Sequence, residues 1–214
     1  MKELRRQRIN ITKIEKDHSV NAEGVWNVGS AALISRYWSG EEAPPERHAA
    51  VRMHWSETAL YVRFDAAQKE PLVISSDPRT DEKTIGLWDR DVCEIFIASD
   101  ILHPEKYFEF EVAPTGEWVD LAVDFENEKR KTDTGYNSGF ESFAAIEDGK
   151  IVIAMKIGWE AFGKTPAAGD VWLGNFFRCI GSDPTRGYLA FEPTFTATPN
   201  FHVPESFVEM TFDQ

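Results

Sequence analysis

A short stretch near the middle of the chain carries the residues with the clearest chemical potential. Trp88, Asp91 and Glu94 follow one another at intervals of three residues. From Asp91 onward the residues are expected to alternate across a β-strand, which places Glu94 on the same face as Val92 and Phe96. A carboxylate among apolar neighbours is costly unless it meets a cation, backbone donors, a metal or a ligand hydroxyl. The stretch therefore predicts a binding site, and an ion pair between Glu94 and an arginine is the structural alternative.

The overall composition restricts the classes of partner. The 214 residues include 23 Lys and Arg against 36 Asp and Glu, a net charge of -13. Binding to nucleic acid or to an anionic membrane needs a cationic surface, so neither is an expected partner. The basic amino-terminal stretch lacks the apolar core of a signal peptide, and no apolar run approaches the length of a membrane span. We expect a soluble protein, cytoplasmic if Met1 is the native start and extracytoplasmic if a leader preceded it.

Apolar residues alternate with polar ones in many short runs, which is the pattern of β-strands. Three hairpins are predicted, over residues 49–65, 107–125 and 140–157. Residues 126–139 are expected to form a loop. About ten short strands with regularly spaced turn signals and almost no helix predict an all-β fold, an antiparallel β-sandwich of two sheets of the immunoglobulin or jelly-roll kind. We expect residues 1–214 to form a single domain.

The cysteines and the acidic loop before residue 92 raise two further expectations. Cys93 and Cys179 lie in apolar, strand-like runs without metal-binding spacing, which favours two free buried thiols over a single disulfide. A calcium site could include the acids of the loop, namely Asp89 and Asp91 with Asp77 or Asp81. Their spacing is not that of an EF-hand, so a solvated acidic loop is the favoured interpretation.

Blocks of residues along nearly the whole chain resemble the family 9 carbohydrate-binding modules. The resemblance extends to the family-9-like domains that share a sandwich with the dopamine-monooxygenase N-terminal (DOMON) type. It is carried, in order, by residues 59–64, by 87–88 with 91 and 94–97, by 107–111 with 114–116, by 157–159 with 162, by 169–170 with 175–178, and by 201–205. It implies a non-catalytic module that holds a sugar between aromatic rings. Such a design is physically reasonable, because the apolar face of a pyranose packs on a ring while its hydroxyls need polar partners.

The resemblance also implies roles for individual residues. Trp88 matches one tryptophan of the sugar slot, and Glu94 matches the acid that accepts hydrogen bonds from sugar hydroxyls. Asn175 and Arg178 fall where family members carry polar residues on a late strand; either ligand contact or satisfaction of Glu94 fits this position, and the second is favoured. The expected ligand-binding residues are Trp88, Asp91, Glu94, Asn175, Arg178, Phe191, Phe201 and His202.

The proline-rich loop at residues 193–204, called the late loop below, departs from the family pattern. Family members usually carry a tryptophan before the proline of this loop, whereas this chain has Phe191 two residues before Pro193. A phenyl ring stacks over a smaller area, so one alternative is a scaffold that has lost its ligand. Phe195, Phe201 and His202 could supply the second wall of the slot instead.

Two alternatives involve chemistry rather than binding. Hydrolysis of a glycosidic bond needs one carboxyl group with a raised pKa and one that is ionised. The available acids are Glu94, Glu109, Glu111, Asp120 and Asp124, and no spacing selects a pair among them. Sandwiches of the DOMON type can hold haem between a methionine and a histidine. Candidates for such a pair include Met53, Met155 and Met210 with His54, His103 and His202, again without a local signature.

We therefore expect a saccharide ligand, no enzymatic activity and no cofactor. A glycoside hydrolase of the same pathway is a candidate partner.

Overall fold

β-Strands make up nearly all of the regular structure. The computed structural model describes residues 6–27, 29–126 and 129–214. The strands are β1 (Arg8–Lys13), β2 (Ala32–Ile34), β3 (Arg36–Tyr37), β4 (Ala49–Trp55), β5 (Ala59–Ala67), β6 (Val92–Ala98), β7 (Lys106–Val112), β8 (Trp118–Glu126), β9 (Lys129–Asp133), β10 (Glu141–Glu147), β11 (Lys150–Gly158), β12 (Val171–Ile180), β13 (Gly187–Ala190) and β14 (Val208–Phe212). The short 3-10 helices are η1 (Gly24–Asn27), η2 (Pro45–Arg47), η3 (Leu87–Asp89), η4 (Trp159–Phe162) and η5 (Pro204–Ser206). Within the described residues, no helix is long and apolar enough to cross a membrane.

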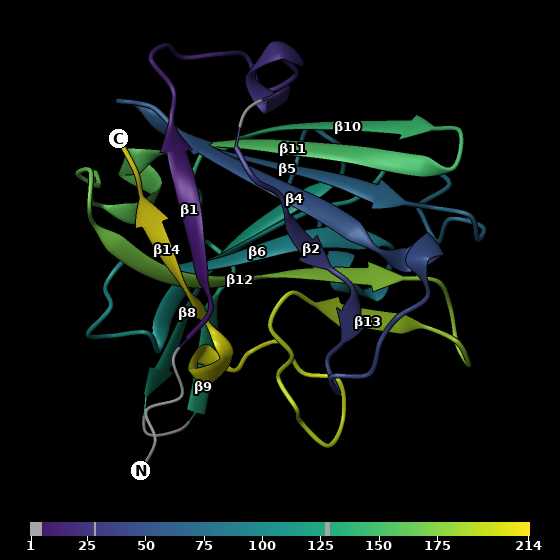
Figure 1. Cartoon of the computed structure of the whole chain (residues 1–214). Coiled ribbons are helices and arrows are strands. Elements are labelled where there is room, and N and C mark those ends of the chain that lie inside the picture. Colours follow the sequence, from purple (N-terminus) through teal and green to yellow (C-terminus); the bar gives the residue numbers. More distant parts are fainter. Residues whose placement is uncertain (1–5, 28, 127–128) are drawn as a thin grey trace.

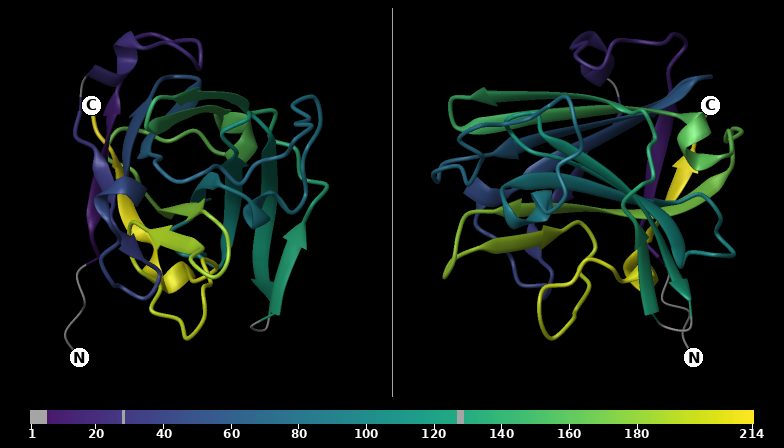
Figure 2. Two further views of the ribbon diagram at one scale, coloured as in Figure 1. Left: turned by 90° about the vertical axis from the view of Figure 1, so that its right-hand side faces the viewer. Right: turned by 180° about the vertical axis from the view of Figure 1, so that it is seen from behind.

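The strands form two sheets that curl around a common interior (Figures 1 and 2). Sheet 1 runs in the order β3, β13, β12, β6, β7, β8, β9, with β14 beside the first half of β12. Sheet 2 runs in the order β10, β11, β5, β4, β2. The three predicted hairpins are present as β4–β5, β7–β8 and β10–β11. The predicted all-β, single-domain sandwich is thus confirmed.

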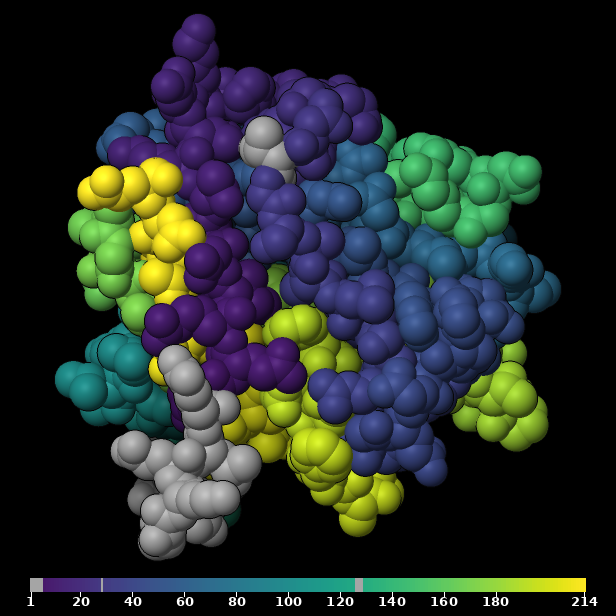
Figure 3. Space-filling model, in the orientation of Figure 1, coloured from purple at the N-terminus to yellow at the C-terminus, as the bar shows by residue number. Residues whose placement is uncertain are grey.

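Two features differ from the predicted arrangement. Strand β1 pairs in parallel with β14 through residues 8–11 and then with β4 through residues 12–13, so it joins the two sheets. Hairpins give antiparallel pairs only between consecutive strands, whereas β1 and β14 come from opposite ends of the chain. They lie side by side on the surface in Figure 3. The expected loop at 126–139 is also partly wrong, because Lys129–Asp133 forms β9 against β8.

Strand β6 separates two apolar clusters. Its residues Cys93, Ile95 and Ile97 point into the main core between the sheets. The alternate residues, which include Val92 and Phe96, point to the outer face of sheet 1, where a second apolar cluster lies beneath the late loop. The predicted alternation along β6 is confirmed. As a result, the outer face of sheet 1 is itself buried and can carry a site.

The two cysteines lie on opposite faces of sheet 1. Cys93 belongs to the main core, whereas Cys179 belongs to the outer cluster, and both are free and buried. Their side chains point in opposite directions from neighbouring strands, so they cannot form a disulfide with each other. The prediction of two free buried thiols is confirmed.

Gly174 on β12 has no room for a side chain. A methyl group at this position would overlap the backbone carbonyl of Phe96 and the side chain of Met210. The Gly174→Ala substitution should therefore lower the free energy of unfolding by about 1 to 3 kcal/mol. For a chain of this length, each kcal/mol corresponds to roughly 2 to 4 °C in Tm, which differential scanning calorimetry can measure.

Gly24 is the matched control, because a methyl group there meets no atom within 4 Å. The Gly24→Ala substitution should leave Tm almost unchanged. Equal Tm values for the two variants would contradict the packing described for β12.

Candidate functional site

A pocket of about 320 Å³ lies on the outer face of sheet 1. Six neighbouring strands contribute lining residues: β13 (Tyr188), β12 (Cys179), β6 (Glu94, Phe96), β7 (Glu109), β8 (Leu121) and β9 (Arg130, Thr132). Helix η3 adds Trp88 and Asp89, and the late loop adds Pro199, Asn200, Phe201 and His202. The sheet thus forms the floor of the pocket, while η3 and the late loop form walls.

Acidic side chains are concentrated at this floor. Glu94 lies directly across from Glu111 in the β6–β7 pair, and Glu109 is two residues before Glu111 on the same face. Carboxylate oxygens of these three residues lie within 4.8 Å of one another, and all three side chains are buried. Like charges that face each other across two strands are destabilising. The cluster therefore needs protons or a cation to offset its repulsion.

Burial and mutual repulsion change the acidity of these groups. Burial, followed by the charge of Glu109, raises the pKa of Glu94 to about 8. Burial also raises the pKa of Glu109 and, together with the charges of Glu94 and Glu109, raises the pKa of Glu111 well above its usual range. The thiol of Cys179 donates to Glu94 Oε1 at 3.4 Å. Near neutral pH the floor therefore holds protons when the pocket is empty.

The carboxyl groups are also short of hydrogen-bond donors. Glu109 Oε2 and both carboxylate oxygens of Glu111 are buried without a hydrogen-bond partner among the described residues. A buried polar atom without a partner costs about 1 to 3 kcal/mol. The pocket floor can therefore accept donors from a bound molecule.

His202 closes one side of the floor as a neutral ring. Burial, followed by the charge of Arg130, lowers the pKa of His202 to about 3. The hydroxyl of Tyr107 lies 2.7 Å from Nδ1 of His202 and can donate to it. Although Glu109 Oε2 lies 4.0 Å from the same nitrogen, the neutral ring gives Glu109 no countercharge.

Aromatic rings line the pocket beside the acids. Trp88 is 38% exposed, which is unusual for a tryptophan in this chain. Phe201 stacks on Phe177 with a centroid distance of 4.2 Å and an interplanar angle of 14°. Tyr188 meets Phe201 edge to face at 6.2 Å. The pocket therefore combines a polar floor with apolar ring surfaces.

Arg186 holds the wall that carries Trp88. Its guanidinium donates to the backbone oxygens of Trp88 at 2.7 Å and of Arg90 at 2.9 Å, and to Gly181 O at 2.9 Å. The same group lies over the ring of Tyr188, 5.3 Å from its centroid. One side chain therefore fixes the backbone under Trp88 and contacts the ring of Tyr188.

Half of the sequence-predicted site residues come together in this pocket. Trp88, Glu94, Phe201 and His202 line it. Asp91, Asn175, Arg178 and Phe191 lie outside its lining.

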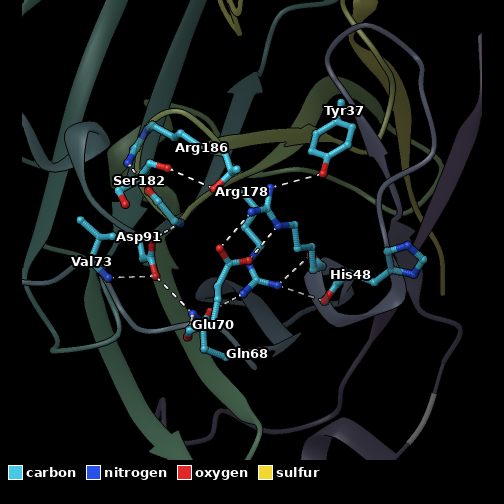
Figure 4. A network of polar contacts seen from close by, with 12 residues as sticks. Tyr37, His48, Gln68, Glu70, Val73, Asp91, Arg178, Ser182 and Arg186 are labelled. Atoms are coloured by element: carbon cyan, nitrogen blue, oxygen red, sulfur yellow. Dashed lines mark hydrogen bonds and ion pairs between the residues drawn. The ribbon is translucent and has the colours of Figure 1, made fainter.

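Arg178 belongs to a buried network on the opposite face of sheet 1 (Figure 4). It donates to the backbone oxygens of Arg47 at 2.8 Å and His48 at 3.1 Å, and to Gln68 Oε1 at 2.7 Å. The expectation that it satisfies Glu94 is wrong, because Arg178 and Glu94 project from opposite faces of the sheet. The ion pair considered for Glu94 is therefore not formed with this arginine.

Asp91 also has a structural role in this network. Its carboxylate accepts from the backbone N–H groups of Gly181 at 2.7 Å and Val73 at 3.2 Å, and from Gln68 Nε2 at 3.4 Å. The residue ties the segment before η3 to the turn after β12. Asp89 and Asp91 were the acids considered for a calcium site. Among the described residues, the acids that lie close enough together to hold a cation are instead Glu94, Glu109 and Glu111.

Asn175 and Phe191 position the beginning of the late loop. Asn175 donates to Glu192 O at 2.8 Å and accepts from the backbone N–H groups of Glu192 and Phe176, so it does not satisfy Glu94. Phe191 packs edge to face on Phe176, 5.9 Å away, against the main core. Tyr188 therefore supplies the pocket ring that sequence analysis sought at Phe191.

Several residues that line the pocket were not among the predicted ligand-binding residues, above all Glu109, Tyr188 and Arg130. The alternation of acids in residues 107–113 was visible, but an acidic strand face is usually exposed to water. Here the late loop covers it. The haem candidates are separated, because Met53, Met155 and Met210 lie in the main core whereas His202 lines the pocket.

The raised pKa of Glu94 predicts a pH dependence of stability. Between its ordinary value of 4.5 and about 8, the folded state keeps a proton on Glu94 that the unfolded chain has lost. Stability should therefore fall as pH rises through this window, by at most about 1.4 kcal/mol per pH unit for one group. The neutral Glu94→Gln variant should show a shallower decline of Tm with pH.

The exposed Glu46 provides a control, since the Glu46→Gln substitution makes the same chemical change at a site that does not line the pocket. Its Tm should follow that of the wild type at every pH. Identical pH profiles for the wild type and Glu94→Gln would contradict the buried, proton-holding carboxyl group.

Comparison with known proteins places this architecture in a family. A structure from Bacteroides uniformis, assigned as a carbohydrate-binding protein, matches with a TM-score of 0.72 and 18% identity over 97% of this chain and 100% of that one. A family 9 carbohydrate-binding module from Caldicellulosiruptor kristjanssonii in complex with glucose matches with a TM-score of 0.67 and 17% identity, over 97% and 96% of the two chains. A family 9 module from the same organism in complex with cellotriose gives a TM-score of 0.67 and 16% identity, over 97% and 94% of the two chains. No curated protein matches the sequence significantly.

These structural matches support the fold. The sequence itself matches the family model described as "Carbohydrate family 9 binding domain-like" over residues 19–183, which is well over half of the chain. The resemblance that was expected from the sequence is confirmed, and the chain belongs to the carbohydrate family 9 binding domain-like family.

Proposed function

We propose that the pocket on sheet 1 binds one ring of a saccharide, with Trp88 and Tyr188 as ring contacts and Glu94 and Glu109 as acceptors. The observation that carries this proposal is the combination of aromatic ring surface with a buried carboxyl group, that of Glu109, whose Oε2 has no hydrogen-bond partner within the described residues. A pyranose offers an apolar face to the rings and hydroxyl donors to the acids. The complexes of the structurally similar module with glucose and cellotriose agree with a ligand of this class.

We further propose that the pocket binds without catalysis. A glycosidase needs one ionised carboxylate beside one protonated carboxyl group. In this pocket burial raises the pKa of Glu94, Glu109 and Glu111 alike, so their surroundings do not set one acid apart from one carboxylate. Asp120, another acid considered for catalysis, is occupied by Lys83 and Ser138 away from the cluster. A glycoside hydrolase acting on the same polysaccharide is the partner we propose.

Isothermal titration calorimetry with a panel of monosaccharides and short oligosaccharides tests this proposal. We expect at least one sugar to bind the wild type and to lose roughly tenfold or more in affinity in Trp88→Ala, because removal of one stacking ring costs about 1 to 2 kcal/mol. Tyr188→Ala should weaken the same sugar.

Phe195→Ala is the matched control, since Phe195 is 66% exposed but does not line the pocket. It should bind the sugar as the wild type does. The proposal fails if no sugar binds the folded wild type, or if Phe195→Ala reduces affinity and Trp88→Ala does not. Release of reducing sugar from an oligosaccharide, abolished by Glu94→Gln, would contradict the non-catalytic part.

A further inference from the structure

The pocket has an excess of acid that a neutral sugar would not use. Asp89, Glu94 and Glu109 line it, and Glu111 lies against the last two. Arg130 is the one cationic side chain among the lining residues that the structure describes, because burial keeps His202 neutral. A cation that enters the pocket favours the ionised forms of these carboxyl groups, so they release protons as it binds and then pair with its charge.

The hydrogen-bond requirements of the floor point in the same direction. Glu109 Oε2 and both oxygens of Glu111 are buried and have no partner within the described residues, and Glu94 accepts one weak bond from a thiol. A hydroxyl group of a sugar can donate only one hydrogen bond, whereas a protonated primary amine can donate three. Hydrogen bonds between an ammonium group and a carboxylate are also stronger than neutral ones.

The aromatic rings of the pocket indicate which kind of ligand would carry the positive charge. A bare metal ion would use the carboxylates but would leave the rings of Trp88, Tyr188 and Phe201 without a role, and calcium takes six to eight oxygen ligands. A pyranose that bears an amine would use both parts of the pocket. Its ring packs on the aromatic side chains while its ammonium group reaches Glu94 and Glu109.

We propose that the pocket selects an amino sugar, whose protonated amine is bound by Glu94 and Glu109. This inference rests on the proposed saccharide function and narrows it to a ligand class. Glu94 and Glu109 contact the amine directly, whereas Glu111 lies close to both but does not line the pocket. Arg130 opposes binding of the cation from the rim of the pocket.

Calorimetric titration with three methyl glycosides tests this, at a pH where the amine is protonated. The ligands are those of glucosamine, N-acetylglucosamine and glucose, which differ only in the group at carbon 2. The wild type should bind the glucosamine derivative roughly tenfold more tightly than either neutral sugar. The Glu109→Gln variant should bring the ratio close to one.

The Arg130→Gln substitution should change the preference for the amine in the opposite direction to Glu109→Gln. Loss of folding cannot produce an increased preference. Arg130 is exposed on β9, and its removal should increase the preference for the amine a further two- to fivefold. Glucose binding without preference for glucosamine would overturn this inference and leave the proposed function intact. Absence of all sugar binding would overturn both.

A metal ion at the floor is the competing outcome. The same titrations with calcium, magnesium or manganese chloride should give no heat of binding. A metal that binds the wild type, fails to bind Glu109→Gln and is displaced by no sugar would overturn the assignment to an amine.

Discussion

Burial of three carboxyl groups on one face of a sheet is the constraint on which the region around the pocket depends. Glu94 and Glu111 face each other across β6 and β7, with Glu109 beside them. Water would screen their repulsion, but all three side chains are almost completely buried. Burial and mutual repulsion raise the pKa values of these groups, which favours their protonated forms and so reduces the repulsion while the pocket is empty. A ligand that brings donors or positive charge therefore compensates a deficit already present in the free protein.

The walls of the pocket must be fixed if the cluster is to stay buried. Asp91 ties the segment before η3 to the turn after β12, and Arg186 on the other side of that turn binds the backbone beneath Trp88. Asn175 holds the start of the late loop through Glu192. Such fully bonded polar groups restrict rotamers and backbone together. Three residues that do not form the pocket lining thus support the ones that do.

Much of the fold and part of the site could be predicted from the sequence. Alternation gave the hairpins and the faces of β6, because a period of two is set by local geometry. It could not give the register that brings Glu111 opposite Glu94, because a shift in the β6–β7 pairing leaves the alternation of each strand unchanged. Nor could it show that Tyr188 on β13 lines the pocket, because the packing of the late loop decides this. Thus Tyr188 was missed and Phe191 was expected in its place. The assignment of Arg178 to Glu94 failed because the facing of β12 relative to β6 depends on long-range pairing.

A crystal structure of the protein with a bound monosaccharide tests the central claim most directly, that the buried carboxyl cluster and the rings beside it form one ligand site. The account predicts a sugar ring packed on Trp88 or Tyr188, with a polar group within hydrogen-bond distance of Glu94 and Glu109. A sugar bound at another surface, such as the exposed ring of Phe195, with an empty pocket in the same crystal, would contradict it.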